Sequence, residues 1–157
     1  MKLLIPSAKE LNEQARIVEP QPLSENTKTI LQALKQFSLE ELASFYGISE
    51  ERAQVEKERI EALLAGSAKT YPALELFDGL MYRSIERQDL SEKEQAYLQE
   101  HLLITTALYG VLPAYEGIAP HRLDFMMKLK PAGKSLKVLW KEGYDQAVEG
   151  EEQILSL

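Results

Sequence analysis

TALYGVLPAYEGIAPHRLDFMMKL, residues 106–129, is the most distinctive stretch of the chain. It contains two tyrosines, two glycines, two prolines and a His-Arg pair between apolar runs. Glycine and proline at this density predict a sharply turning connection. Such a connection can serve the fold, with its tyrosines packed in the core, or it can present backbone amides to phosphates. The residues alone leave both interpretations open.

Strands are predicted on both sides of this connection. LLITTALY favours a buried strand near 103–107, and RLDFMMKLK alternates in the way that predicts a strand over 123–129. Three further apolar runs predict strands over 2–5, 73–77 and 153–156. Together these segments indicate a small mixed sheet.

Helices are expected to dominate residues 24–66. Ser38 with Glu41 forms a capping box, and glycines at 47 and 66 mark helix ends. A second capping box at Ser91 and an amphipathic helix beginning at Ser135 are expected further on. We therefore predict an α/β or α+β fold, with a helical N-terminal third packed on the small mixed sheet in a single domain of residues 1–157.

The composition excludes several classes of protein. The chain has 157 residues, 45% of them hydrophobic, which suits one globular domain. There is no run of about 18 apolar residues, so we expect no membrane span and a cytoplasmic location. Cysteine is absent and only two histidines occur, which excludes disulfides and thiolate zinc sites. We predict no metal site, no cofactor and no catalytic residue from composition.

The charge is unevenly distributed. The formal net charge is −7, yet residues 120–141, called the basic segment below, hold six basic residues against Asp124 alone. The rest of the chain has 12 basic and 24 acidic residues. A cluster of one sign is commonly a solvated face, and it is also what a phosphate-binding surface requires.

Two local patterns suggest chemistry. Gly133-Lys134-Ser135 looks like the end of a phosphate-binding loop, but Lys128 occupies the position of the required first glycine, so Ser135 is better explained as a helix cap. Ser7 and Lys9 could form a lysine-activated serine, although no oxyanion hole is identifiable and a structural loop is the simpler interpretation.

Four segments in one order resemble the YaaA family of bacterial peroxide-stress-resistance proteins. These are MKLLIPSAKELN at the start, LELFDGLMYRSI, HLLITTALYGVLPAYEGIAPHRLDF and GKSLKVLW. The resemblance implies a mixed α/β fold of the family's own type. It also implies DNA binding through a basic cleft with a helix-hairpin-helix-like element, and protection of DNA from iron-driven oxidative damage.

The matching positions supply the candidate residues. Combined with the basic segment, they give candidate DNA-binding residues Lys9, Tyr109, Gly110, Arg122, Lys128, Lys130, Lys134 and Lys137. The other family-motif positions are Ser7, Gly79 and Tyr82. An enzyme of unknown substrate remains the alternative, with a site at the strand ends near Ser7, Lys9, Tyr82, Tyr109 and Arg122. Convergence of those side chains in a closed pocket would favour the enzyme, and lysines lining an open groove would favour nucleic acid.

The sequence departs from the family pattern in ways that affect these expectations. The family's Ser-Pro order is here Pro6-Ser7, and its Lys-Gly-Asp is here Asp78-Gly79-Leu80, which loses a cation. Family members continue past residue 157, so we expect an incomplete fragment with an exposed edge at QILSL that could pair with a second copy. Without the family's later basic segment, we expect only weak DNA binding.

Overall fold

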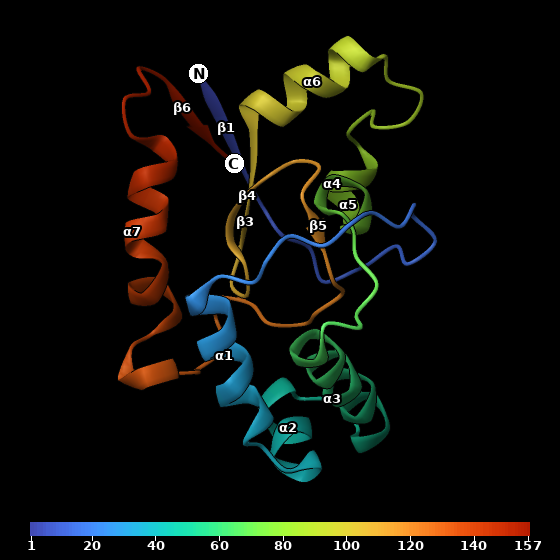
Figure 1. The fold of residues 1–157 in the computed structure, drawn as a ribbon, viewed down its shortest axis with the longest axis vertical. Coiled ribbons are helices and arrows are strands. Elements are labelled where there is room, and N and C mark those ends of the chain that lie inside the picture. The colour runs from blue at the N-terminus through green and yellow to red at the C-terminus, as the bar shows by residue number, and fades with distance from the viewer.

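A computed structural model describes residues 1–157, and its strands form two sheets (Figure 1). The larger sheet has the order β4-β3-β1-β6, in which β1 pairs in parallel with both β3 and β6, and β3 pairs antiparallel with β4. A two-stranded antiparallel sheet joins β2 and β5. The strands are β1 (Lys2–Pro6), β2 (Tyr71–Pro72), β3 (Leu102–Thr106), β4 (Gly110–Pro113), β5 (Gly117–Ile118) and β6 (Ile154–Ser156).

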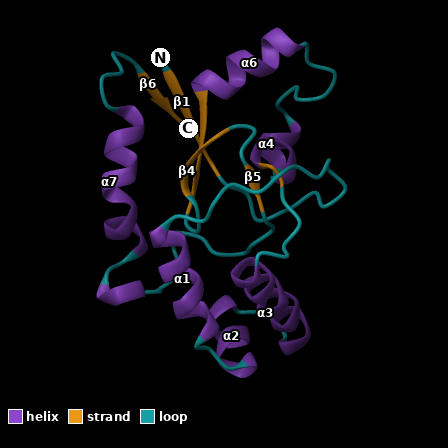
Figure 2. Ribbon diagram, in the orientation of Figure 1, coloured by secondary structure: helices purple, strands orange, loops and turns teal.

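Seven α-helices surround the sheets, so the predicted mixed α/β class is confirmed. Figure 1 shows α1–α3 grouped below the larger sheet, α7 running beside it and α6 near its upper end. Figure 2 shows that irregular segments fill much of the space between the sheet and α1–α3. The helices are α1 (Glu25–Lys35), α2 (Leu39–Tyr46), α3 (Glu50–Ala65), α4 (Ala73–Leu76), α5 (Leu80–Arg83), α6 (Glu92–His101) and α7 (Leu136–Val148).

The predicted helix starts are confirmed by their caps. Both capping boxes form: the side chain of Ser38 accepts from Glu41 N, and that of Ser91 accepts from Glu94 N. Ser135 caps α7 by accepting from Val138 N, which confirms the structural explanation of the Gly-Lys-Ser tripeptide. Each such cap satisfies backbone donors that a helix leaves free, and contributes about 1 kcal/mol.

Two hydrophobic cores lie side by side along the molecule. One is built from α1–α3, α7 and the turn after β3, with Ile30, Leu31 and Trp140 among its buried members. The other lies against β1 and β3 and includes Leu74, Phe77 and Tyr82 from the region of α4 and α5. Tyr109 packs against both cores. The segment that begins at Thr106 is therefore where the two cores meet.

The predicted strand over 73–77 is wrong. Residues Ala73–Leu76 form α4, preceded by the short β2, whose Tyr71 pairs with Ile118. Pro72 sits at the N-cap position of α4, and Ala, Leu and Glu are strong helix formers. The apolar run is buried because α4 lies inside the second core, and burial alone does not distinguish a strand from a short helix.

The predicted strand over 123–129 is also wrong. The segment turns instead, because the side chain of Asp124 accepts from Met126 N and its carbonyl accepts from Met127 N. Leu123 and Leu129 are buried in the first core. A turn at Asp124 directs Leu123 and Leu129 into the core, so their burial does not require a strand. Asp is a residue that favours such turns. Two strands that were not predicted from the sequence, β4 and β5, lie earlier in the chain.

The family resemblance implies a helix-hairpin-helix-like element without assigning it to a segment, and a helical hairpin is present in the first third of the chain. Helices α2 and α3 pack together and are joined by the short turn at Gly47–Ser49, with Gly47 in the left-handed conformation. Acidic side chains occupy the first turn of α3, at Glu50 and Glu51. These charges repel phosphate, so we do not assign the hairpin to nucleic-acid contact. None of the helices is both long enough and apolar enough to cross a membrane.

The strand at the sheet edge, β6, has the exposed apolar character that was expected. Ile154, Leu155 and Leu157 are 46%, 52% and 70% exposed, and β6 pairs only with β1. No charge or proline protects this edge. Two copies related by a two-fold axis could pair their β6 edges antiparallel, since the same apolar residues would meet on both sides.

We therefore predict that the 157-residue chain self-associates through β6. Light scattering should show a dimer whose population rises with concentration. Leu155→Lys should shift the chain toward the monomer, because a charge on an edge strand opposes pairing. Val138→Lys, at another exposed apolar position in α7, serves as the matched control. An equal response to both substitutions, or a monomer at all concentrations, would contradict the prediction.

Candidate functional site

The turn after β3 is hydrogen-bonded to side chains of α1 and α7. The carbonyl of Ala107 accepts from Trp140 Nε1 at 2.7 Å, and that of Leu108 accepts from Thr27 Oγ1 at 2.8 Å. The Tyr109 amide donates to Thr106 Oγ1 at 2.7 Å. These bonds fix α7 and α1 onto the end of the sheet. The backbone amides and carbonyls of this turn are therefore used within the fold.

Gly110 has two reasons to be glycine. Its φ is +78°, in the left-handed region that other residues disfavour. A Cβ built on Gly110 would lie 2.6 Å from the indole ring of Trp140, closer than any normal contact. The family-motif glycine is thus a packing position beneath Trp140.

Four aromatic rings connect the two family-motif blocks through the core. Tyr82 contacts Phe77 with ring centroids 5.6 Å apart, Phe77 lies 6.1 Å from His121, and His121 lies 5.5 Å from Tyr109. Both tyrosine hydroxyls are engaged by the backbone: Tyr82 donates to the Pro6 carbonyl at 2.6 Å, and Tyr109 accepts from the Ala119 amide at 3.0 Å. Burial raises the pKa of Tyr109 to about 12. Neither hydroxyl is available as an acid or base near neutral pH.

His121 is buried in this row of rings and is neutral. Its Nδ1 lies 2.9 Å from the Ala119 carbonyl oxygen, so Nδ1 carries the proton and donates. Burial lowers the pKa of His121 to about 4, with Arg59 nearby adding to the effect and the bond to Ala119 opposing it. The imidazole therefore holds the 119–121 backbone in place without charge at neutral pH.

Arg122 pairs with a buried carboxylate. Glu56 of α3 is 4% exposed, accepts from Arg59 Nη1 at 2.7 Å and lies 3.8 Å from Arg122 Nε. Burial raises the pKa of Glu56, more than the two arginines lower it. The candidate cation Arg122 is thus partly used to attach the basic segment to α3.

The lysines of the basic segment have a different environment. Lys128, Lys130, Lys134 and Lys137 are exposed and form no ion pair. Lys137 also lines an open hollow of about 350 Å³ between α7 and the 123–129 segment. Its walls are Phe125, Lys137, Lys141 and Tyr144, and this set is called the aromatic hollow below. The rings of Phe125 and Tyr144 meet edge to face at 6.5 Å. Lys137, an unpaired cation beside two aromatic rings, suits contact with nucleic acid.

The remaining motif positions meet at the end of β1. Ser7 N donates to the Thr105 carbonyl at 3.0 Å, which continues the pairing of β1 with β3. A Cβ on Gly79 would lie 3.0 Å from Ala8 Cβ, so glycine lets α5 approach the loop after β1. Lys9 is exposed and forms no ion pair. Ser7, Gly79 and Tyr82 therefore lie together at the end of β1, where their contacts are structural.

The five residues proposed for an enzyme site lie apart from the principal pockets. None of the five principal pockets is lined by Ser7, Lys9, Tyr82, Tyr109 or Arg122. No group of three His, Asp or Glu side chains is placed to share a metal ion. Of the lysines in the basic segment, Lys137 and Lys141 line the open hollow.

Two charged centres were missed from the sequence. Glu56 follows Ala53 and precedes Ile60 and Leu63 on the buried face of α3, so its place in an apolar stripe at helical spacing was a usable signal. Arg87 donates to the carbonyls of Leu74 and Phe77 and to Asp78, and nothing in its sequence context indicates this.

Comparison with known proteins identifies the family. The family model described as "Peroxide stress protein YaaA" matches residues 1–157. The chain belongs to this family. Its relatives include UPF0246 proteins of Streptococcus gordonii and Streptococcus sanguinis, each 57% identical over 157 residues, and of Streptococcus pneumoniae, 54% identical. In each case the whole chain is aligned, covering 64% of the S. gordonii protein and 65% of the other two.

The expectation of an incomplete YaaA-like fragment is contradicted in part. The family model covers this chain from end to end, so all of it follows the family pattern. The chain nevertheless spans 64–65% of the length of the UPF0246 relatives. The function of the longer YaaA-family proteins is therefore assigned to this chain only as a proposal.

Proposed function

We propose that this chain binds DNA through the basic segment, in a cytoplasmic protein that protects DNA during peroxide stress and limits iron-driven damage. The observation that carries the proposal is the set of four exposed lysines without ion pairs, Lys128, Lys130, Lys134 and Lys137. Membership of the peroxide stress family supports the cellular role. Phosphate contacts of this kind position a protein on DNA without reading sequence.

The neighbouring aromatic hollow supports the same surface. Phe125 and Tyr144 offer ring faces and edges next to Lys137, so one surface combines charge with stacking area. Lys141 contributes less, because its Nζ donates to Asp145 at 2.7 Å. That partner also raises the pKa of Lys141. We expect Lys137 to be the main cation of the aromatic hollow.

The expected affinity of the chain by itself is low. Its net charge of −7 opposes the approach of a polyanion, and four to six cations provide only sequence-independent binding. We expect a dissociation constant on the order of 10⁻⁴ M or weaker at physiological salt. Fluorescence anisotropy at low salt, where such binding is strengthened, makes the interaction measurable.

Removing two lysines should identify the surface. We predict that Lys134→Ala with Lys137→Ala lowers the log–log salt slope on duplex DNA by about 1.8, because each lost phosphate contact removes about 0.9. Arg122 is left unchanged, since its loss would disturb buried Glu56. The control is Lys35→Ala with Lys93→Ala, which removes the same charge from exposed positions in α1 and α6. If the control lowers the slope equally, the basic segment is not the contact surface.

A further inference from the structure

A large polar pocket lies apart from the basic segment. Its volume is about 700 Å³, and eight of its eleven lining residues are polar. It is formed where the loop after β1, α4, the loop before α6 and the β4–β5 turn meet, and it shares no residue with the aromatic hollow. The lining residues, called the polar pocket below, are Asn12, Gln14, Ala15, Glu75, Asp78, Arg87, Gln88, Asp89, Leu90, Gln95 and Tyr115.

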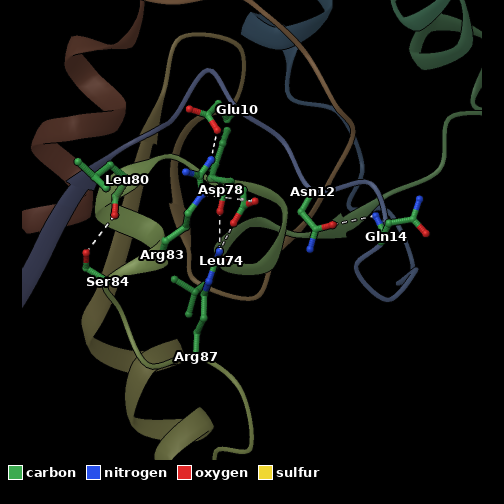
Figure 3. Close-up of polar contacts among 10 residues, drawn as sticks. Glu10, Asn12, Gln14, Leu74, Asp78, Leu80, Arg83, Ser84 and Arg87 are labelled. Carbon is green, nitrogen blue, oxygen red and sulfur yellow. Dashed lines mark hydrogen bonds and ion pairs between the residues drawn. The ribbon is translucent and has the colours of Figure 1, made fainter.

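Hydrogen bonds hold the walls of the polar pocket in place. Figure 3 shows Asn12 accepting from the Gln14 amide, at 3.0 Å. The Asn12 amide donates to the Leu76 carbonyl at 2.7 Å. Gln95 Nε2 donates to the Leu90 carbonyl at 3.0 Å, and the Tyr115 amide donates to Gln99 Oε1 at 2.9 Å. These bonds order the backbone of the walls, whereas the side chains of Gln14, Gln88 and Asp89 are exposed and are not held by such bonds. A ligand would therefore have to order these three side chains when it binds.

The charges of the polar pocket are mostly neutralised within the protein. Arg87 is its only cation, and its guanidinium donates to two backbone carbonyls and to Asp78 (Figure 3). The carboxylate of Glu75 accepts from Arg16. Asp89 alone has no ion pair or hydrogen bond to its carboxylate. A phosphate or carboxylate ligand would find no free cation and one free anion, so anions are disfavoured.

Carboxamides supply the free hydrogen-bonding groups. The side chains of Gln14 and Gln88 bond to nothing in the protein, while Asn12 Nδ2 and Gln95 Oε1 are also free. Each free carboxamide offers a donor and an acceptor at fixed spacing, and a pair of neighbouring hydroxyls offers the same two functions. The ring of Tyr115 and the side chain of Leu90 add apolar wall against which carbon–hydrogen faces can pack.

We propose that the polar pocket binds a small neutral polyhydroxyl compound of the size of a sugar. Its neutralised charges disfavour anions, and its carboxamides match vicinal hydroxyls. The site is independent of the DNA proposal because the two surfaces have no residue in common. A negative result for sugar binding would therefore not contradict the DNA proposal, and a negative result for DNA binding would not contradict the sugar proposal.

The test is titration of the ¹⁵N-labelled chain with ribose, glucose and ribose 5-phosphate, followed by the side-chain amide resonances of Gln14 and Gln88. We expect saturable shifts with ribose or glucose and a dissociation constant on the order of 1 mM. Ribose 5-phosphate should bind more weakly than ribose on the unchanged chain. Asp89→Asn should reduce that difference.

A double variant locates the binding. Gln14→Ala with Gln88→Ala should weaken ribose or glucose binding by about fivefold or more, the effect of losing one net hydrogen bond. Gln54→Ala with Gln146→Ala, exposed glutamines of α3 and α7, is the control and should leave binding unchanged. No saturable shift with either sugar, tighter binding of ribose 5-phosphate than of ribose, or equal weakening by both double variants would overturn the proposal.

Discussion

Gly110→Ala should destabilise the chain by about 2–5 kcal/mol. Holding a residue with a Cβ in the left-handed region costs about 1–2 kcal/mol, and forcing a methyl into a packed site costs about 1–3 kcal/mol. Both terms apply, because Gly110 has φ +78° and its added Cβ would meet the Trp140 ring at 2.6 Å. Against a typical domain stability of about 5–15 kcal/mol, this is a large fraction.

The chain provides a matched control for the two terms. Gly133 has the same φ of +78°, and a Cβ there would contact nothing within 4 Å. Gly133→Ala should therefore cost only the backbone term, about 1–2 kcal/mol. Urea unfolding gives both values, and Trp140, the one tryptophan of the chain, reports on the site through its fluorescence.

A double-mutant cycle isolates the ring contact. In a Trp140→Leu background the cost of Gly110→Ala should fall toward that of Gly133→Ala, because the atoms that the methyl meets are gone. Circular dichroism follows unfolding in this background, where the fluorescent reporter is absent. If Gly110→Ala and Gly133→Ala cost the same in the unchanged background, the contact with Trp140 is not what requires glycine.

The second large effect is a loss of stability in acid that depends on His121. The folded pKa is about 4, below the ordinary value of 6.5, so between these values the unfolded chain binds more protons than the folded chain. The contribution of neutral His121 to the free energy of unfolding is complete above about pH 6.5 and is lost as the pH falls toward 4. A depression of this size corresponds to about 3 kcal/mol.

His121→Asn should flatten the pH dependence in that window. Asn keeps an amide donor for the Ala119 carbonyl and does not titrate. Urea unfolding between pH 7 and pH 4 measures the difference in slope, with His101→Asn as the control that leaves the buried ring intact. Glu56 affects stability in the opposite direction, since its raised pKa favours the folded state as the pH falls, and it is present in both variants. Parallel pH profiles for the unchanged chain and His121→Asn would contradict the assignment.

The parts of the fold that follow from local patterns were predictable. Serine caps, capping boxes and helical spacing indicated α1–α3, α6 and α7, because each signal lies within a few residues of the helix that it starts. The strands β1, β3 and β6 were also predicted, since each is a continuous apolar run in a parallel arrangement. The failures at 73–77 and 123–129 concern apolar residues buried by distant contacts.

The candidate site was less predictable for a similar reason. The family resemblance indicated Tyr82, Tyr109 and Gly110, but the structural role of each depends on a contact with another segment: Pro6 for Tyr82, Ala119 for Tyr109 and Trp140 for Gly110. No local spacing encodes those pairings. The exposed lysines of the basic segment were easier to predict from the sequence, because the exposure of a lysine does not depend on contact with a distant residue.

The position of β1 at the centre of the sheet has a consequence for synthesis of the chain. β1 is made before its partners β3 and β6, which lie about 100 and about 150 residues later in the chain. At about 5–20 residues per second, the first strand waits several seconds or longer for its neighbours. Helices α1–α3 rely on local contacts and can form meanwhile. The larger sheet therefore closes after these helices, and until then the apolar β1 has neither of its strand partners.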